Sequence, residues 1–183
     1  LPVGYHGRSS SIVVSGTNFH RPKGQTKPAE DAEVVFGPSR QLDFELEMAF
    51  ISCGSTELGQ SIAVAEAEKH IFGLVLFNDM SARDIQKWEY VPLGPFLSKS
   101  FVSIVSPWVV TLEALAPFRV EGPDQSPTPL PYLQQTGANN FDIELEVLLK
   151  PAFAAEKLIC RSNFKYMYWS MFQQLAHQTV AGC

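Results

Sequence analysis

A strict alternation of apolar and acidic residues at positions 42–48 constrains the fold more than any other feature of this chain. Alternate side chains of a β-strand point to opposite faces, so the pattern predicts a strand over 42–50 with one apolar face. The other face would carry the carboxylates of Asp43, Glu45 and Glu47 in a row. Two interpretations are open: a solvated acidic face, or a site for a hard divalent cation that relieves the repulsion between the carboxylates.

A second copy of the pattern shows that the spacing alone does not identify a metal site. Asp142, Glu144 and Glu146 repeat the Asp-x-Glu-x-Glu arrangement in a predicted strand at 141–149. A further ligand from a neighbouring strand would separate the two copies. The first copy has a candidate in Asp79, whose carboxylate is equally suited to a structural ion pair.

Short periodic segments predict the other elements. The apolar run 71–79 is typical of a strand buried on both faces. Ser81 is suited to cap a short helix over 81–86, on which Arg83 and Gln86 project from one face. Further helices are predicted at 61–70 and 163–175, and a further strand at 101–105.

Glycine and proline residues mark three connecting segments. Residues 16–40 are predicted to have little regular structure, and 87–96 to form a shaped loop suited to a pocket wall. Residues 116–140 are predicted to lead away from the core before the second acidic strand pairs back into the sheet. Lys99 is either an exposed lysine or a buried functional cation, and composition alone favours the exposed lysine.

Composition argues against several classes of protein. The net charge is −5 without any block of Lys or Arg, which argues against a nucleic-acid-binding surface. No uncharged apolar run reaches the roughly 18 residues that span a bilayer, so we expect no membrane partner. Cys53, Cys160 and Cys183 lack metal-type or redox-type spacing, so we expect structural cysteines in a reducing intracellular setting.

Four longer segments, taken together, resemble the fumarylacetoacetate hydrolase family, and the resemblance extends over essentially all 183 residues. The segments are LPVGYHGR at 1–8, LDFELEMAF at 42–50, NDMSARDIQKWEYVPLGPF at 78–96 and NFKYMYW at 163–169. The loop WEYVPLGPF favours the branch that cleaves 4-fumarylacetoacetate over the acylpyruvate hydrolases and decarboxylases of the broader superfamily.

The resemblance implies an α+β fold with a mixed β-sheet roll, here incomplete at both ends. Residues 1–183 would be the central part of a catalytic domain, without the small SH3-like domain that precedes it in the family. The family member would be a cytoplasmic homodimer that acts on a small-molecule substrate in tyrosine and phenylalanine catabolism. The chain begins at Leu1 and stops just after a helical pattern, so we expect a piece of a longer protein.

The resemblance also separates the two acidic strands. Glu45, Glu47 and Asp79 match the family's ligands for calcium (Ca²⁺). Lys99 and Ser103 match its positions for a second metal, magnesium (Mg²⁺), which shares Asp79. Because an ammonium has no lone pair, Lys99 would contribute only its backbone carbonyl there. The residues of the second acidic strand match no functional position.

Further matches imply substrate-binding and catalytic roles. Tyr5, Gln86 and Tyr90 match substrate-contacting positions, while Arg83, Gln86 and the Lys99 ammonium are suited to stabilise a developing oxyanion. The implied reaction is hydrolysis of a carbon–carbon bond of the β-diketone 4-fumarylacetoacetate to fumarate and acetoacetate. The divalent ion would act as a Lewis acid on the diketone oxygens and stabilise the leaving enolate, while an activated water attacks the carbonyl.

The family's catalytic His and fourth calcium ligand would precede Leu1, and the Glu that orients the His would follow Cys183. We therefore expect the 183-residue piece alone to show little or no turnover. Two other functions remain open. One is a related acylpyruvate hydrolase or β-keto acid decarboxylase, and the other is a non-catalytic calcium-binding module.

Overall fold

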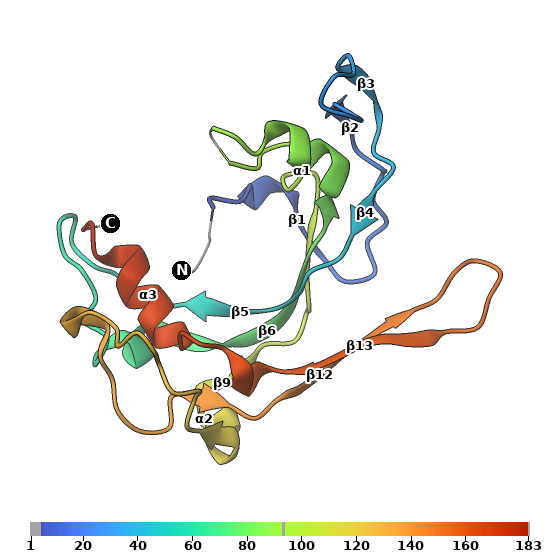
Figure 1. Ribbon diagram of the computed structural model, residues 1–183. Helices are drawn as coiled ribbons and strands as arrows, with labels where there is room; N and C mark the ends of the chain where they lie inside the picture. The colour runs from blue at the N-terminus through green and yellow to red at the C-terminus, as the bar shows by residue number, and fades with distance from the viewer. Residues whose placement is uncertain (1–4, 93, 183) are drawn as a thin grey trace. The chain divides into compact units, whose positions relative to one another are not determined.

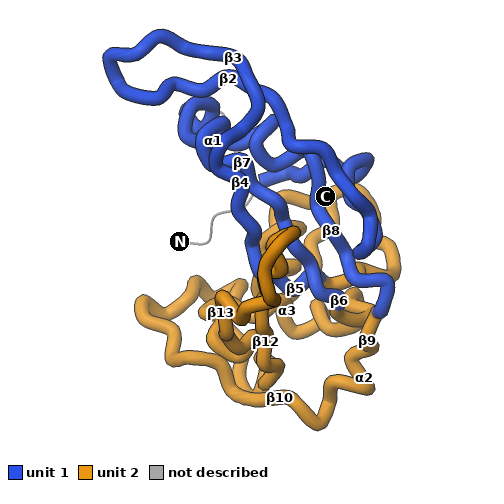
Figure 2. Tube along the Cα trace, turned by 90° about the vertical axis from the view of Figure 1, so that its right-hand side faces the viewer, with its two compact units in different colours: residues 1–49, 75–108 blue, residues 50–74, 109–183 orange. Residues whose placement is uncertain are grey.

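The computed structural model describes residues 5–92 and 94–182, which divide into two compact units (Figure 2). Unit 1 comprises Leu1–Ala49 and Val75–Trp108, and unit 2 comprises Phe50–Leu74 and Val109–Cys183. The family-like segment at 1–4, Leu93 of the predicted loop, and Cys183 lie outside the described residues. Within residues 5–92 and 94–182, none of the helices has the length and hydropathy of a transmembrane span.

The main sheet is mixed, which confirms the α+β class expected of the family (Figure 1). In unit 1, β1 (Ile12–Val14) runs parallel to β8 (Ser103–Val105), which runs antiparallel to β6 (Ile71–Asp79). Next to β6 lies β5 (Leu46–Ser52). The first residues of β6 belong to unit 2, where they pair with β9 (Val110–Thr111).

The first acidic segment is not the single strand that the alternation predicts. It forms β4 (Leu42–Asp43), which pairs with β7 (Ser81–Ala82), and then β5. At the break, the N–H of Phe44 donates to Asp43 Oδ1 at 3.0 Å, and the N–H of Glu45 donates to Asn78 Oδ1 at 3.3 Å. Because side chains satisfy these two N–H groups, the chain can leave one strand partner and join another.

Residues 16–40 contain a hairpin, so the prediction of little regular structure is wrong there. Strands β2 (Lys23–Thr26) and β3 (Val35–Pro38) pair antiparallel, with Gly24 opposite Gly37. The hairpin packs on α1 (Arg83–Glu89), and Gly24 lies against the buried Ile85 of that helix. The hairpin therefore supports the helix that carries Arg83.

Helix α1 begins later than predicted, because Ser81 lies in β7 and does not cap it. The carboxylate of Asp84 instead fixes the chain beside the helix. It accepts hydrogen bonds from Ser39 Oγ at 2.6 Å and from the N–H of Arg40 at 2.7 Å. Unit 1 also contains η1 (Ser9–Ser11).

In unit 2, the predicted helix at 61–70 is reduced to the 3-10 turn η2 (Ala67–His70). The helix predicted at 163–175 is split into η5 (Phe164–Tyr166) and α3 (Met171–Thr179). Ser170 caps α3 in a capping box with Gln173. The buried face of α3 confirms a core-facing helix, although it begins later than predicted.

The second acidic segment does not pair back into the main sheet. It forms β11 (Asn140–Phe141) and β12 (Glu144–Leu149), which pair with β10 (Arg119–Val120) and β13 (Lys157–Asn163) in separate two-stranded sheets. The other short helices of unit 2 are α2 (Leu112–Leu115), η3 (Ala116–Phe118) and η4 (Pro131–Leu133).

Strand β6 is buried less evenly than predicted. Leu74 and Val75 are buried, but Phe72 and Leu76, which share a face with Leu74, are each about half exposed, so that face is only partly covered in the described part. Asp79, at the end of β6, is only 7% exposed. The strand therefore delivers a carboxylate into an enclosed position.

We expect Gly24→Ala to lower the free energy of unfolding by about 1–3 kcal/mol, because the new Cβ would lie 2.7 Å from Ile85 Cδ1 in a filled space. Urea unfolding of the full-length protein measures the change. Gly37→Ala is a matched control, because a Cβ there meets no atom within 4 Å. Adding Ile85→Val should recover part of the loss, and strictly additive effects would contradict the packing explanation.

Hydrogen bonds to Asp84 predict an acid-sensitive contact. Burial by itself raises the pKa of Asp84, but hydrogen bonds from Arg40, Ser39 and Ile85 hold it below the ordinary value of 3.8. Because the folded pKa is depressed, this stability is present above the unfolded pKa and is lost as pH falls through the folded value. Below about pH 4, the thermal midpoint of Asp84→Asn should therefore fall less steeply with decreasing pH than that of Asp31→Asn, a control at an exposed site. Parallel curves for the two variants would contradict this.

Candidate active site

A buried lysine ammonium lies between two carboxylates of unit 1. Lys99 is 4% exposed, and its Nζ lies 2.5 Å from Glu45 Oε2 and 3.6 Å from Asp79 Oδ2. The Asp79 contact is longer than a hydrogen bond, and Nζ has no hydrogen-bond partner among the described residues. Composition favoured an exposed lysine and was wrong, since the two negative charges offset the cost of burying this cation.

Strand register brings two further residues onto Asp79. In the antiparallel pair of β6 and β8, Asp79 lies opposite Ser103. The Ser103 hydroxyl donates to Asp79 Oδ1 at 2.8 Å, and the Tyr5 hydroxyl donates to Asp79 Oδ2. The Lys99 ammonium also lies 5.7 Å from the centre of the Tyr5 ring. Asp79 thus joins a tyrosine, a serine and a lysine that are distant in sequence.

Arg83 forms a second group of contacts around the same acidic segment. Its Nε lies 2.9 Å from Asp43 Oδ2, and its Nη1 lies 2.8 Å from Glu45 Oε1. Nη1 also donates to Gln86 Oε1 at 3.0 Å, which confirms that Arg83 and Gln86 share a face of α1. Burial by itself lowers the pKa of Arg83, but the contacts with Asp43 and Glu45 raise it above its ordinary value.

The surroundings of Glu45 and Glu47 shift the pKa values of the two carboxyl groups in opposite directions. Burial raises the pKa of Glu45, but contacts with Lys99 and Arg83 outweigh burial and leave the pKa below its ordinary value. Burial is the largest cause of the raised pKa of Glu47, and the negative charge of Glu45 raises it further. Glu47 therefore holds a carboxylate whose charge the neighbouring cations do not fully balance.

The carboxylates of this site are chemically suited to bind a hard divalent cation. Glu45, Glu47 and Asp79 supply carboxylate oxygens, the ligands that Ca²⁺ and Mg²⁺ prefer, and a cation would stabilise the ionised form of Glu47. Among the described residues, however, no group of three or more His, Cys, Asp or Glu side chains is gathered closely enough to hold a metal ion. Convergence of the three carboxylates on one ion remains a prediction.

A carboxylate that the sequence analysis missed fixes the loop before Lys99. Glu89 accepts hydrogen bonds from the N–H groups of Phe96, Leu97 and Ser98 at 2.7, 3.2 and 2.9 Å. The N–H of Ala82 donates to Ser98 O at 2.9 Å and ties the loop to β7. The available signal was an acid at the last residue of a helix, where the helix dipole disfavours negative charge.

The predicted residues differ in how closely they gather. Side-chain contacts connect Tyr5, Glu45, Asp79, Arg83, Gln86, Lys99 and Ser103 in unit 1. Glu47 joins them through its electrostatic interactions. Tyr90 is 48% exposed and forms no side-chain hydrogen bond with another described residue of this group.

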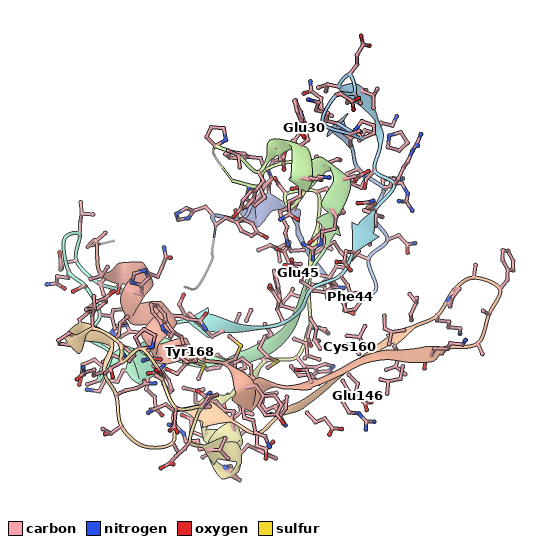
Figure 3. The ribbon with its side chains drawn as sticks, in the orientation of Figure 1. Glu30, Phe44, Glu45, Glu146, Cys160 and Tyr168 are labelled. Carbon is pink, nitrogen blue, oxygen red and sulfur yellow. The ribbon has the colours of Figure 1, made fainter. Side chains whose placement is uncertain are left out.

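The second acidic segment has surface partners of its own. Figure 3 labels Glu146 on the β12–β13 hairpin. Glu146 pairs with Arg161, while Asp142 lies 3.2 Å from Lys165 Nζ. Figure 3 also labels Glu45, at the break between β4 and β5. A polar cavity of about 780 Å³ in unit 2 is lined by none of the predicted site residues. The predicted site residues therefore all lie in unit 1, away from this cavity.

Comparisons with known proteins found relatives over the whole length of this chain. The chain is 58% identical over 184 residues to a fumarylacetoacetase of Oryza sativa subsp. japonica and 62% identical over 186 residues to one of Dictyostelium discoideum. Each alignment covers all of this chain but only 43% and 44% of the relative, so the chain spans less than half the length of either.

A solved structure shows the same fold at low identity. The yeast protein ynq8, a fumarylacetoacetate hydrolase family protein, is 20% identical, with a TM-score of 0.54. The alignment covers 94% of this chain and 64% of the yeast chain. The family model described as fumarylacetoacetate (FAA) hydrolase C-terminal matches residues 1–182. This chain therefore belongs to the fumarylacetoacetate hydrolase family.

Proposed function

We propose that this chain supplies the metal-binding and part of the substrate-binding side of a fumarylacetoacetase. The whole protein would hydrolyse 4-fumarylacetoacetate to fumarate and acetoacetate, a step of tyrosine and phenylalanine catabolism. The observation that carries the proposal is the contact of one buried ammonium, Lys99, with Glu45 and Asp79. Identity to fumarylacetoacetases over the whole length of the chain supports this substrate.

The carboxylates of Glu45, Glu47 and Asp79 would hold the principal divalent ion, for which we propose Ca²⁺. Ser103 and the backbone carbonyl of Lys99 would contribute to a second site, for Mg²⁺, that shares Asp79. When bound, such an ion acts as a Lewis acid toward the diketone oxygens. The hydrogen bond from Ser103 to Asp79 supports the idea that these two side chains act together.

The chain's own cations would stabilise negative charge that develops on the substrate. Arg83 and Lys99 are positively charged groups held next to Glu45, and removing one such donor typically costs about 10²–10³ in rate. Gln86, in contact with Arg83, and the exposed Tyr90 would bind the substrate. Tyr5 would orient the substrate while its hydroxyl contacts Asp79.

The other features of the proposal rest on the family. We propose a cytoplasmic homodimer without nucleic-acid or membrane partners. The base that activates water and the remaining calcium ligand would come from parts of the whole protein outside these 183 residues. The second acidic strand takes no part, in keeping with its surface ion pairs with Arg161 and Lys165.

Substrate identity is tested by assaying the full-length protein with 4-fumarylacetoacetate, acylpyruvates and oxaloacetate under the same conditions. We expect kcat/KM to be greatest for 4-fumarylacetoacetate, because the 88–96 loop is similar to that of the fumarylacetoacetase branch. A higher kcat/KM for an acylpyruvate, or decarboxylation of oxaloacetate alone, would instead identify a related enzyme of the same superfamily.

Metal binding is tested with Glu45→Gln and Glu47→Gln in the full-length protein, with Glu146→Gln as the matched control on the second acidic strand. Loss of a residue that only supports a metal ligand typically lowers metal affinity by roughly 10–100-fold. We expect the loss of Ca²⁺ affinity in Glu45→Gln and Glu47→Gln to be larger, because these residues would bind the ion themselves. The shift of the thermal midpoint with added Ca²⁺ and isothermal titration measure the loss. Turnover should be lost as well. A Glu45→Ala protein that keeps turnover while losing stabilisation by Ca²⁺ would favour a purely structural calcium module.

A further inference from the structure

The carboxylate of Asp43 stands apart from the proposed metal ligands although it belongs to the same acidic segment. Its Oδ1 accepts the N–H of Phe44 at 3.0 Å, at the break between β4 and β5. Its Oδ2 accepts Nε of Arg83 at 2.9 Å. Each carboxylate oxygen of Asp43 therefore accepts a hydrogen bond, Oδ1 from the backbone at the strand break and Oδ2 from the guanidinium of Arg83.

Backbone pairing fixes both partners of this contact. In the β4–β7 pair, Asp43 lies opposite Ser81, and Ser81 precedes Arg83 by two residues. The N–H of Arg83 also donates to Gln41 O at 2.8 Å, directly before β4. The side chains of Asp43 and Arg83 thus start from backbone positions that are tied together on both sides.

The guanidinium is planar, so partners on two of its nitrogens determine its orientation. Nη1 contacts Glu45 and Gln86, and Nε contacts Asp43. Glu45 is also paired with Lys99 and is a proposed metal ligand, so its charge is shared. Asp43 has no such competing cation among the described residues. It is therefore the carboxylate best able to hold the plane of Arg83.

We propose that Asp43 is a positioning residue that holds the guanidinium of Arg83 in the orientation needed to stabilise negative charge on the substrate. This role rests on the proposed hydrolysis of 4-fumarylacetoacetate. Asp43 touches neither the substrate nor the ion, and it acts through Arg83. The Asp-x-Glu-x-Glu segment then carries two functions: its first acid orients a cation, and its second and third acids bind the metal.

The chain contains its own control for this proposal. Asp142 occupies the same place in the second copy of the motif, and it pairs with Lys165 at 3.2 Å and with Asn163 at 2.6 Å. Those contacts belong to unit 2 and include no proposed site residue. Asp142→Asn therefore makes the same chemical change in the same motif, away from Arg83.

The test measures kcat and KM for 4-fumarylacetoacetate with the full-length protein at saturating divalent ion. Asp43→Asn keeps the shape of the side chain and an oxygen for the N–H of Phe44 but removes the charge that faces Nε. We expect kcat and kcat/KM to fall together by roughly 10–100-fold, with KM nearly unchanged. Asp142→Asn should leave both constants unchanged, and Asp43→Glu, which keeps the charge, should recover part of the rate.

A double-mutant cycle then separates a positioning role from a structural one. In an Arg83→Gln background, adding Asp43→Asn should lower kcat no further, because the residue acts through Arg83. An equal further loss in that background would overturn the proposal, as would a lower thermal midpoint with unchanged kcat in Asp43→Asn. If the unsubstituted full-length protein does not hydrolyse 4-fumarylacetoacetate, the proposed function itself fails, and the role of Asp43 fails with it.

Discussion

The buried ammonium of Lys99 sets the geometry of unit 1, because a cation removed from water requires negative charge close by. Glu45 comes from the break between β4 and β5, and Asp79 comes from the end of β6. Lys99 itself follows a loop that Glu89 fastens through three backbone N–H groups. Three segments must therefore meet at one point, and the β4–β7 pair and helix α1 hold them there.

Local patterns in the sequence predicted the elements that carry either an unbroken apolar run or apolar residues at helical spacing. The apolar run of β6 and the apolar face of α3 are examples, although the ends of α3 and α1 differ from the prediction. The helix predicted at 61–70 is reduced to η2, because contacts with α3 rather than local propensity decide the conformation of this segment. One of these contacts is the N–H of Ile62, which donates to Thr179 Oγ1. The β2–β3 hairpin was missed because glycine and proline dominate its segment.

The candidate site shows the limit of motif spacing more sharply. The Asp-x-Glu-x-Glu pattern occurs twice, and its two copies have different surroundings: Arg83 and Lys99 beside the first, Arg161 and Lys165 beside the second. Spacing alone could not distinguish them, and only the resemblance to a family selected the first. Neither the partner of Asp43 nor the role of Glu89 was predicted, because each depends on contacts with a distant segment or a folded loop.

The two-residue break at Phe44 and Glu45 makes this stretch intolerant of changes in length. On one side, β4 is fixed to β7, and on the other, β5 is fixed beside β6. A one-residue deletion between them would reverse which side chains of β5 point to each face. Leu46 and Met48 would then occupy the orientations now held by acids. Natural or engineered variation in chain length should therefore concentrate elsewhere, for instance in the exposed turn at 150–156 between β12 and β13.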